Sequence, residues 1–149
     1  MLVKEMMTKE IITVSPDMQV RKFADLLIDK NISGAPVVDD QGNLLGLALE
    51  KGVMFLDKNV HLPSFIHIAM GFFTFGVKKF EEEIKKVTAS KVSEIMIKEY
   101  VSFSEDMSVE DAATIMLEKD VYYCPVLKGQ KLIGIVTKRD IVRSIAKEA

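Results

Sequence analysis

The residues of this sequence best suited to hold a ligand form the run Thr137-Lys138-Arg139-Asp140. Thr137 ends an apolar segment typical of a strand, and Asp140 falls in the first turn of the helix expected to follow. An aspartate carboxylate can accept hydrogen bonds from two neighbouring ribose hydroxyls, and such charge-assisted bonds are strong. The free N–H groups and positive dipole end of the helix suit phosphate, and Lys138 and Arg139 add positive charge beside them. The run therefore suits the sugar and phosphate of a nucleotide.

A purely structural interpretation competes with this one. Thr137-x-x-Asp140 also has the spacing of a capping box, in which the two side chains satisfy backbone N–H groups at the start of a helix. Spacing alone favours the cap, so these residues by themselves leave both interpretations open.

An earlier copy of the run, in residues 46–52, lacks both side chains. Leu49 stands in place of the threonine, and Gly52 stands in place of the aspartate. Neither residue can hold a ribose through its side chain. If the later run holds a ligand, the sequence offers one intact site, and the earlier copy is empty, structural or adapted to a less polar ligand.

The earlier copy belongs to a repeat that covers most of the chain. Residues 7–38 align without gaps with residues 96–127, and the match resumes, one residue out of step, after the next turn. The identical pairs are Met7/Met96, Lys9/Lys98, Glu10/Glu99, Ser15/Ser104, Asp17/Asp106, Met18/Met107, Val20/Val109, Ala24/Ala113, Lys30/Lys119, Pro36/Pro125 and Val37/Val126.

Each copy shows the same order of elements. A strand is followed by a helix with one apolar stripe, then by two strands joined by a polar turn, and then by a second helix. In the first copy the expected elements are strands over residues 11–14, 35–38 and 44–49 and a helix with the stripe Val20, Phe23, Ala24, Leu27 and Ile28. In the second copy they are strands over residues 100–103, 124–127 and 132–137, a helix capped by Ser108 and Asp111 with the stripe Val109, Ala112, Ala113, Met116 and Leu117, and a final helix with Ile141, Val142, Ile145 and Ala146 on one face.

These elements predict an α/β (α+β) fold made of two β-α-β-β-α units. Each unit offers one apolar sheet face and would be marginally stable alone. Two units can bury these faces against each other around a pseudo-twofold axis, which leaves equivalent clefts between them. We assign residues 1–56 to the first unit, residues 57–90 to a helical insert and residues 91–149 to the second unit.

The insert resembles neither copy. Residues 65–75 are apolar on all sides, so this stretch must be buried, and residues 78–87 carry the i,i+4 charge pairs of a partly exposed helix. A helical arm packed on its own module is the favoured interpretation, and a surface for a dimer or a target protein is the alternative. His61 and His67 have no companion cysteine or carboxylate cluster, so we expect no metal site.

The charge, the hydrophobic segments and the motifs that are absent narrow the class of protein. A net charge of −2 over 149 residues gives no general attraction to nucleic acid or acidic membranes. No signal peptide is recognisable, and the most apolar segment, residues 62–77, is too short to span a bilayer, so we expect a soluble cytoplasmic protein. Cys124 lies at an apolar position and suits a small buried hydrophobe better than a nucleophile. No Gly-rich phosphate loop and no recognisable pair of catalytic carboxylates occur, so we do not expect an enzyme.

Several short motifs recur along the two copies. They are Val3-Lys4-Glu5-Met6-Met7-Thr8, Thr13-Val14-Ser15-Pro16-Asp17, Gly34-Ala35-Pro36-Val37-Val38-Asp39, Val92-Ser93-Glu94-Ile95-Met96 and Gly134-Ile135-Val136-Thr137-Lys138-Arg139-Asp140. Their order, spacing and duplication resemble the CBS-domain family. The resemblance implies a tandem pair, often called a Bateman module, that commonly dimerises into a flat disc. Members bind AMP, ADP, ATP, S-adenosylmethionine or similar ligands and usually regulate another activity.

In that family a cleft combines the threonine and aspartate of one repeat with the early strand and the pre-proline segment of the other. The resemblance therefore implies a ligand cleft with one side made of Ile135, Thr137, Lys138, Arg139 and Asp140. The opposite side would be made of Thr8, Lys9, Ile11, Ile32, Ser33, Gly34 and Ala35. Tyr122, the counterpart of Ser33, suits the same cleft, although Tyr122 and Tyr123 equally suit the core or a dimer interface.

Taken together, the intact run and the resemblance predict a regulatory module that binds an adenosine-type nucleotide and forms a homodimer, with a further protein as a possible target. The alternative is a structural or protein-interaction module that docks a partner through its Phe-rich insert, with no nucleotide bound. A nucleic-acid binder is a third and weaker hypothesis, against which the slightly acidic charge balance stands.

Overall fold

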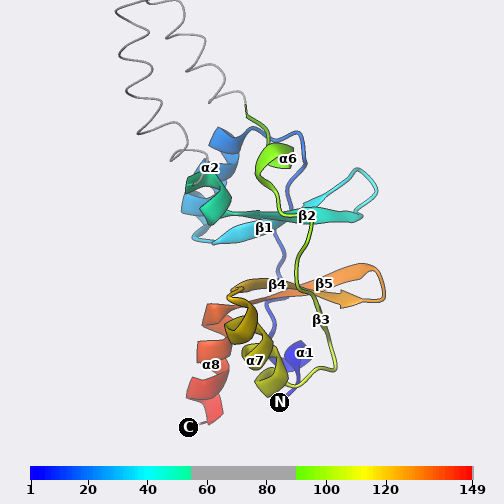
Figure 1. The fold of residues 1–149 in the computed structure, drawn as a ribbon, viewed down its shortest axis with the longest axis vertical. Coiled ribbons are helices and arrows are strands. Elements are labelled where there is room, and N and C mark those ends of the chain that lie inside the picture. Colours follow the sequence, from blue (N-terminus) through cyan, green and yellow to red (C-terminus); the bar gives the residue numbers. More distant parts are fainter. Residues whose placement is uncertain (55–89, 149) are drawn as a thin grey trace, which may run out of the picture.

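In the computed structural model, residues 1–54 and 90–148 are described, and they form two similar halves stacked one above the other (Figure 1). The predictions for the insert, including its helix and its buried phenylalanines, lie outside these residues. The helices are α1 (Val3–Met6), α2 (Val20–Lys30), α6 (Val92–Ile95), α7 (Val109–Lys119) and α8 (Lys138–Glu148). The strands are β1 (Gly34–Val38), β2 (Leu44–Leu49), β3 (Phe103–Ser104), β4 (Tyr123–Lys128) and β5 (Lys131–Thr137).

The two predicted hairpins form, one in each half. Strands β1 and β2 pair antiparallel, with Gly34 opposite Leu49, and β4 and β5 pair in the same way, with Tyr123 opposite Thr137. Each hairpin has one register shift, at the equivalent places after Val37 and Val126. The two hairpins therefore match each other even in the place of their register shift. The predicted α+β fold of two repeats is confirmed.

The first strand of each repeat is shorter than the sequence suggests. Phe103–Ser104 pairs parallel with β4, but residues 11–14 contribute only one parallel bridge, between Val14 and Val37. The reason is that Thr8 pairs with Ile135 in the other half, so residues 9–13 must span the distance between the two hairpins. An apolar run of strand-like composition is thus used as a crossing segment.

The first helix of each repeat follows its apolar stripe. Val20, Phe23 and Leu27 of α2 are buried, and so are Val109, Ala112 and Met116 of α7. Ser108 caps α7 as predicted, because its Oγ accepts a hydrogen bond from the Asp111 N–H at 3.1 Å, whereas Gln19 makes no side-chain bond at the start of α2. In the ranges 1–54 and 90–148, no helix is long and apolar enough to cross a bilayer.

The prediction for the inward face of α8 is partly wrong. Ile141 packs against the core, but Val142 and Ile145 are exposed, and the buried positions are Asp140 and Ser144. Asp140 and Ser144 lie one turn apart, so the helix turns a polar stripe inward at the point where the two halves meet. Hydrophobic periodicity misplaced this face because the inward side chains are polar ones that find hydrogen-bond partners.

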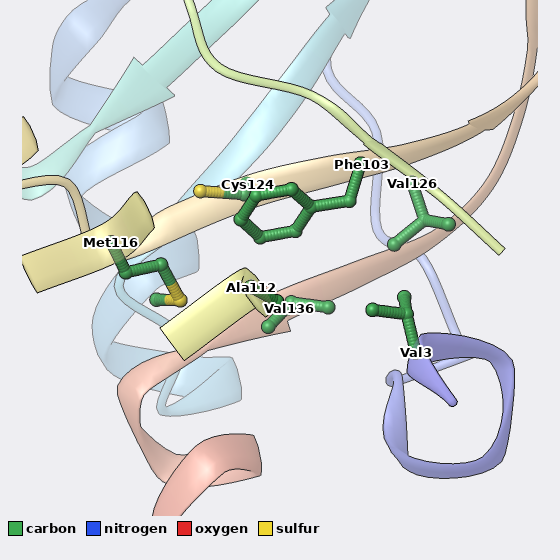
Figure 2. Packing of buried hydrophobic residues seen from close by; sticks show 7 residues of the cluster. All are labelled: Val3, Phe103, Ala112, Met116, Cys124, Val126 and Val136. Carbon is green, nitrogen blue, oxygen red and sulfur yellow. The ribbon is translucent and has the colours of Figure 1, made fainter. Parts of the chain in front are cut away.

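Each half borrows the leading helix of the other repeat. Helix α1 opens the first repeat, yet Val3 is fully buried among Phe103, Cys124 and Val136 of the second half (Figure 2). Its backbone N–H bonds to the Met107 carbonyl at 2.8 Å. The two hydrophobic cores are therefore composite, and neither repeat is complete without the other.

Helix α6 makes the reciprocal exchange, from the second repeat into the first half. Val92 is fully buried with Val14 and Phe23, and its N–H bonds to the Met18 carbonyl at 2.8 Å. In Figure 1, α6 lies beside α2, while α1 lies beside α7 and α8. This exchange is what carries Thr8 and its counterpart, Ile97, across to the other repeat's last strand.

Candidate functional site: the cleft between the two halves

A cleft of about 1030 Å³ opens between the two halves, and both repeats contribute to its walls. This volume is at the upper end of the range for small-molecule sites. The predicted ligand residues that line it are Thr8, Ile11, Ile32, Ser33, Gly34, Tyr122, Ile135, Thr137, Lys138, Arg139 and Asp140. Lys9 is exposed and is not among the lining residues, and Ala35 is fully buried in the core of the first half.

Asp140 is the central polar residue of the cleft, and it is 2% exposed. Its Oδ2 accepts hydrogen bonds from the backbone N–H of Thr137 at 2.8 Å and from the Thr137 hydroxyl at 3.0 Å. Its Oδ1 accepts a hydrogen bond from the Thr8 hydroxyl, at 2.9 Å, which comes from the other repeat. The bond from the Thr137 N–H is one half of a capping box, so the capping interaction anticipated from the spacing is present.

The remaining contacts of Asp140 exceed what a cap needs. A carboxylate has about four lone-pair positions, and here one hydroxyl group donates to each oxygen. Two hydroxyls, one on each oxygen, are also what the vicinal diol of a ribose would supply. Asp140 therefore accepts one hydroxyl from each repeat, on different oxygens of its carboxylate.

Cationic side chains flank the carboxylate on α8. Arg143 Nη1 lies 3.6 Å from Asp140 Oδ1, and its side chain is 54% exposed. Lys138 Nζ lies 4.9 Å from the centroid of the Tyr122 ring, within the range of a cation–π contact. A hydrogen bond between the Tyr122 hydroxyl and the Asp120 carboxylate raises the pKa of Tyr122. The polar end of the cleft thus combines a buried anion with mobile cations and an aromatic ring.

Sequence reasoning missed Arg143. The signal was available, because a residue three positions after Asp140 lies on the same face of a helix. It was overlooked because the ligand motif ends at Asp140, and because Val142 and Ile145 suggested that this part of α8 is a core face.

Tyr122, Tyr123 and Cys124 follow one another in the chain but lie in different environments. Tyr122 and Tyr123 both line the cleft, and burial raises the pKa of Tyr123. Cys124 is fully buried with Phe103 and Met116, and burial raises the pKa of its thiol to about 11. The prediction of Cys124 as a small buried hydrophobe is confirmed.

The other end of the cleft has the same backbone pairing but lacks the side chains of the Asp140 network. Leu47 and Ile97 exchange backbone hydrogen bonds at 2.9 and 2.8 Å, just as Ile135 and Thr8 do at 3.0 and 2.8 Å. However, Ile97 stands where the polar end has Thr8, Leu49 where it has Thr137, and Gly52 where it has Asp140. All three members of the Asp140 network are therefore replaced together by residues without a polar side chain.

Space at Gly52 is also limited. A Cβ at this position would lie 3.1 Å from the Ile95 carbonyl oxygen, which is a tight contact. Where the chain is described, no group of three or more histidine, cysteine or acidic side chains is arranged to hold a metal ion.

The chain is similar to several known proteins over nearly its whole length. It is 30% identical over 154 residues to the uncharacterised protein MJ1426 of Methanocaldococcus jannaschii, covering 97% of this chain and 91% of that one. It is 30% identical over 139 residues to the CBS domain-containing protein YhcV of Bacillus subtilis, covering 93% and 81%. It also matches 22% of the length of an inosine-5'-monophosphate dehydrogenase of Methanocaldococcus jannaschii, at 30% identity.

Among solved structures, the chain is similar to CBSX2, a protein of Arabidopsis thaliana. The crystal structure of CBSX2 in complex with AMP matches with a TM-score of 0.75 and 26% identity, covering 99% of this chain and 97% of that one.

The CBS-domain family model matches the chain twice, over residues 3–58 and 92–147. Each match spans one copy of the repeat, including the leading helix that the fold places in the other half. This chain therefore belongs to the CBS-domain family and carries two CBS repeats.

Proposed function

We propose that this chain is a non-catalytic regulatory module that binds one adenosine-type nucleotide at the polar end of the cleft. The observation that carries the proposal is the Asp140 carboxylate, which is buried in the cleft and receives one hydroxyl on each oxygen. A ribose placed there exchanges two protein hydroxyls for its own, while the Thr137 N–H continues to hold the carboxylate. The carboxylate is thus already held in place, and binding requires the Thr8 and Thr137 hydroxyls to turn away from it.

The similarity to CBSX2 supports an adenosine ligand. That protein was crystallised with AMP, and it is 26% identical to this chain over almost the whole of both. The ligand class proposed for this chain comprises AMP, ADP, ATP and S-adenosylmethionine-like molecules. Tyr122 and Ile135 offer apolar surface beside Asp140 for the flat base.

A regulatory role follows from the position of the ligand between the repeats. Asp140 belongs to the second repeat and Thr8 to the first, so a ligand that takes the place of the Thr8 hydroxyl breaks one contact between them and makes others. The described lining of the cleft includes neither cysteine nor histidine. Binding, rather than turnover, is therefore the proposed activity.

We also propose that the module is a homodimer. Ile28 on α2 and Leu117 on α7 are 78% and 72% exposed, and they occupy equivalent positions of the two repeats. Met54 and Val142 are a second equivalent pair of exposed apolar side chains. Apolar groups that are duplicated by the pseudo-twofold axis suit a self-complementary contact with a second copy of the chain.

The assembly is tested by Leu117→Asp, with Leu45→Asp in the β1–β2 hairpin as a control. A charge in an apolar interface should raise the dissociation constant of the dimer by a factor of about 10 or more. Sedimentation equilibrium should then show a monomer at micromolar concentration for Leu117→Asp only. A wild-type chain that sediments as a monomer at all concentrations would refute the homodimer.

The ligand site is tested by Asp140→Asn, which keeps the shape and an acceptor for the Thr137 N–H but removes the charge. Loss of a charge-assisted bond of about 1.5–3 kcal/mol should weaken AMP binding roughly 10- to 150-fold in calorimetry. The asparagine amide can still donate to the Thr8 hydroxyl, so the free energy of unfolding without ligand should fall by less than about 1.5 kcal/mol.

Ser108→Ala supplies the matched control, because it removes a helix cap of the same repeat away from the cleft. It should cost about 1 kcal/mol of stability and leave AMP affinity unchanged. If Asp140→Asn behaves like Ser108→Ala, with lower stability and unchanged affinity, then Asp140 is only a cap and the proposed site is wrong.

A further inference from the structure

We propose that Arg143 selects ligands with an anionic 5′ group, so that the cleft prefers adenosine phosphates to adenosine and to S-adenosylmethionine. This inference rests on the proposed function and adds the chemical class of the 5′ substituent. Arg143 would contact the phosphate while Asp140 holds the ribose hydroxyls of the same nucleotide.

The position of Arg143 supports this role. Its Nη1 is 3.6 Å from Asp140 Oδ1, too long for a good hydrogen bond, and Oδ1 already accepts the Thr8 hydroxyl at 2.9 Å. A guanidinium carries five N–H donors in a planar fork, so this loose ion pair leaves donors free for another anion. The side chain lines the cleft and is 54% exposed, which gives it room to turn toward a ligand.

The chemistry of a nucleotide brings its phosphate to this place. The 5′ oxygen is joined to the ribose ring by a single methylene group, so a phosphate lies within a few bonds of hydroxyls held by Asp140. A fork of N–H donors can bind a phosphate through two parallel hydrogen bonds. Arg143 can therefore reach the phosphate without leaving the neighbourhood of Asp140.

The other charges of the cleft also favour a phosphate near the start of α8. Lys138 lies over the Tyr122 ring, and Arg139 is exposed on the same turn of α8. Of the acidic lining residues, Glu50 belongs to the first repeat, Glu10 and Glu99 lie on the two crossing segments, and Asp120 is engaged by the Tyr122 hydroxyl.

Comparison of the two repeats in sequence also favours an anionic group beside the second repeat. Glu50 is the counterpart of Lys138, and Phe55 is the counterpart of Arg143. The second repeat thus carries cations where the first carries an acid and an aromatic residue. A sulfonium ligand such as S-adenosylmethionine would place a positive charge beside Arg143, which disfavours it.

The test compares the ligand dependence of Arg143→Gln and Arg143→Lys by calorimetry with adenosine, AMP and S-adenosylmethionine. The wild-type chain should bind AMP about tenfold or more tightly than adenosine. Arg143→Gln should lose about that factor for AMP and change adenosine affinity by less than about twofold, while Arg143→Lys should fall between. Lys147→Gln, an exposed change of the same charge farther along α8, should leave all affinities unchanged.

The outcomes separate this inference from the proposed function. If Arg143→Gln weakens adenosine and AMP equally, Arg143 acts on Asp140 rather than on phosphate, and the inference is overturned while the site stands. If wild-type protein binds S-adenosylmethionine more tightly than AMP, the inference is overturned in the same way. If none of the three ligands binds the wild-type chain, both the inference and the proposed function fail. Adenosine binding by Arg143→Gln also shows that the variant is folded.

Discussion

At the scale of single residues, the helix cap that Asp140 forms is compatible with the ligand role that we propose for it. Its Oδ2 accepts the Thr137 N–H at the start of α8, which is a helix cap. Its two hydroxyl partners can be exchanged for those of a sugar, because a hydroxyl–carboxylate bond is replaced by another of the same kind. The cap could therefore persist while the proposed ligand is bound, so the two interpretations of the sequence do not exclude each other.

The sequence predicted the neighbours of Asp140 unequally. Thr137 and Asp140 stand close together in the chain, so their spacing alone predicted their contact. Thr8 is 132 positions away from Asp140, and it entered only through the resemblance to a family. Arg143 lies within one helical turn, yet no motif includes it, so only the geometry of α8 identifies it.

The buried thiol of Cys124 allows a prediction at this scale. Its side chain is fully buried, and burial raises its pKa to about 11, so almost no thiolate exists near pH 7.5. Iodoacetamide should therefore leave the native protein unmodified at pH 7.5 and label it fully in denaturant, as mass spectrometry would show. The native labelling rate should rise between pH 8 and pH 11. Rapid native labelling at pH 7.5 would contradict the burial of Cys124.

At the scale of elements, the exchange of α1 and α6 is what builds the cleft. It brings the segment after each leading helix against the last strand of the other repeat, where Thr8 pairs with Ile135 and Ile97 pairs with Leu47. Sequence periodicity predicted the helices and hairpins of each repeat because those patterns are local. It could not predict the exchange, because four-residue helices carry little periodicity and their partners lie far along the chain.

Gly46 and Gly134 occupy equivalent positions, and at both of them a crossing segment approaches the strand closely. A Cβ at Gly46 would lie 2.6 Å from the Ile97 carbonyl oxygen, whereas a Cβ at Gly134 would meet mainly the flexible side chain of Met7. We therefore expect Gly46→Ala to destabilise the fold by about 1–3 kcal/mol, since backbone atoms must move. Gly134→Ala should cost less, because Met7 can adopt another rotamer.

Urea denaturation of the two variants would measure this difference. Equal losses of stability would mean that the backbone near Thr8 is as confined as the backbone near Ile97. A greater loss for Gly134→Ala would contradict the account of the crossing segments.

At the scale of the whole molecule, the backbone keeps a pseudo-twofold symmetry that the side chains break. The duplicated hairpins and crossing segments follow from the repeat, and the sequence predicted this architecture well. The asymmetry was also predictable, because Leu49 and Gly52 are aligned with Thr137 and Asp140. The exposed position of Val142 and Ile145 was not, since it depends on how α8 meets the cleft.

The broken symmetry has a consequence for the number of ligands. Among residues 1–54 and 90–148, the carboxylate that accepts two hydroxyls lies at one end of the cleft, and the opposite end has Ile97, Leu49 and Gly52 at the equivalent positions. Ribose hydroxyls placed there would gain no hydrogen bond from these three side chains, and each buried group left unpaired costs about 1–3 kcal/mol. A single high-affinity site is therefore expected for each chain.

The central claim is tested most directly by isothermal titration of the wild-type chain with AMP. We expect one high-affinity site per chain. At a free AMP concentration of 100 times the dissociation constant, the free energy of unfolding should rise by about 2.7 kcal/mol. Asp140→Asn should weaken that same site and leave no other behind. Two equal and independent sites per chain, or no binding of AMP at millimolar concentration, would contradict the account.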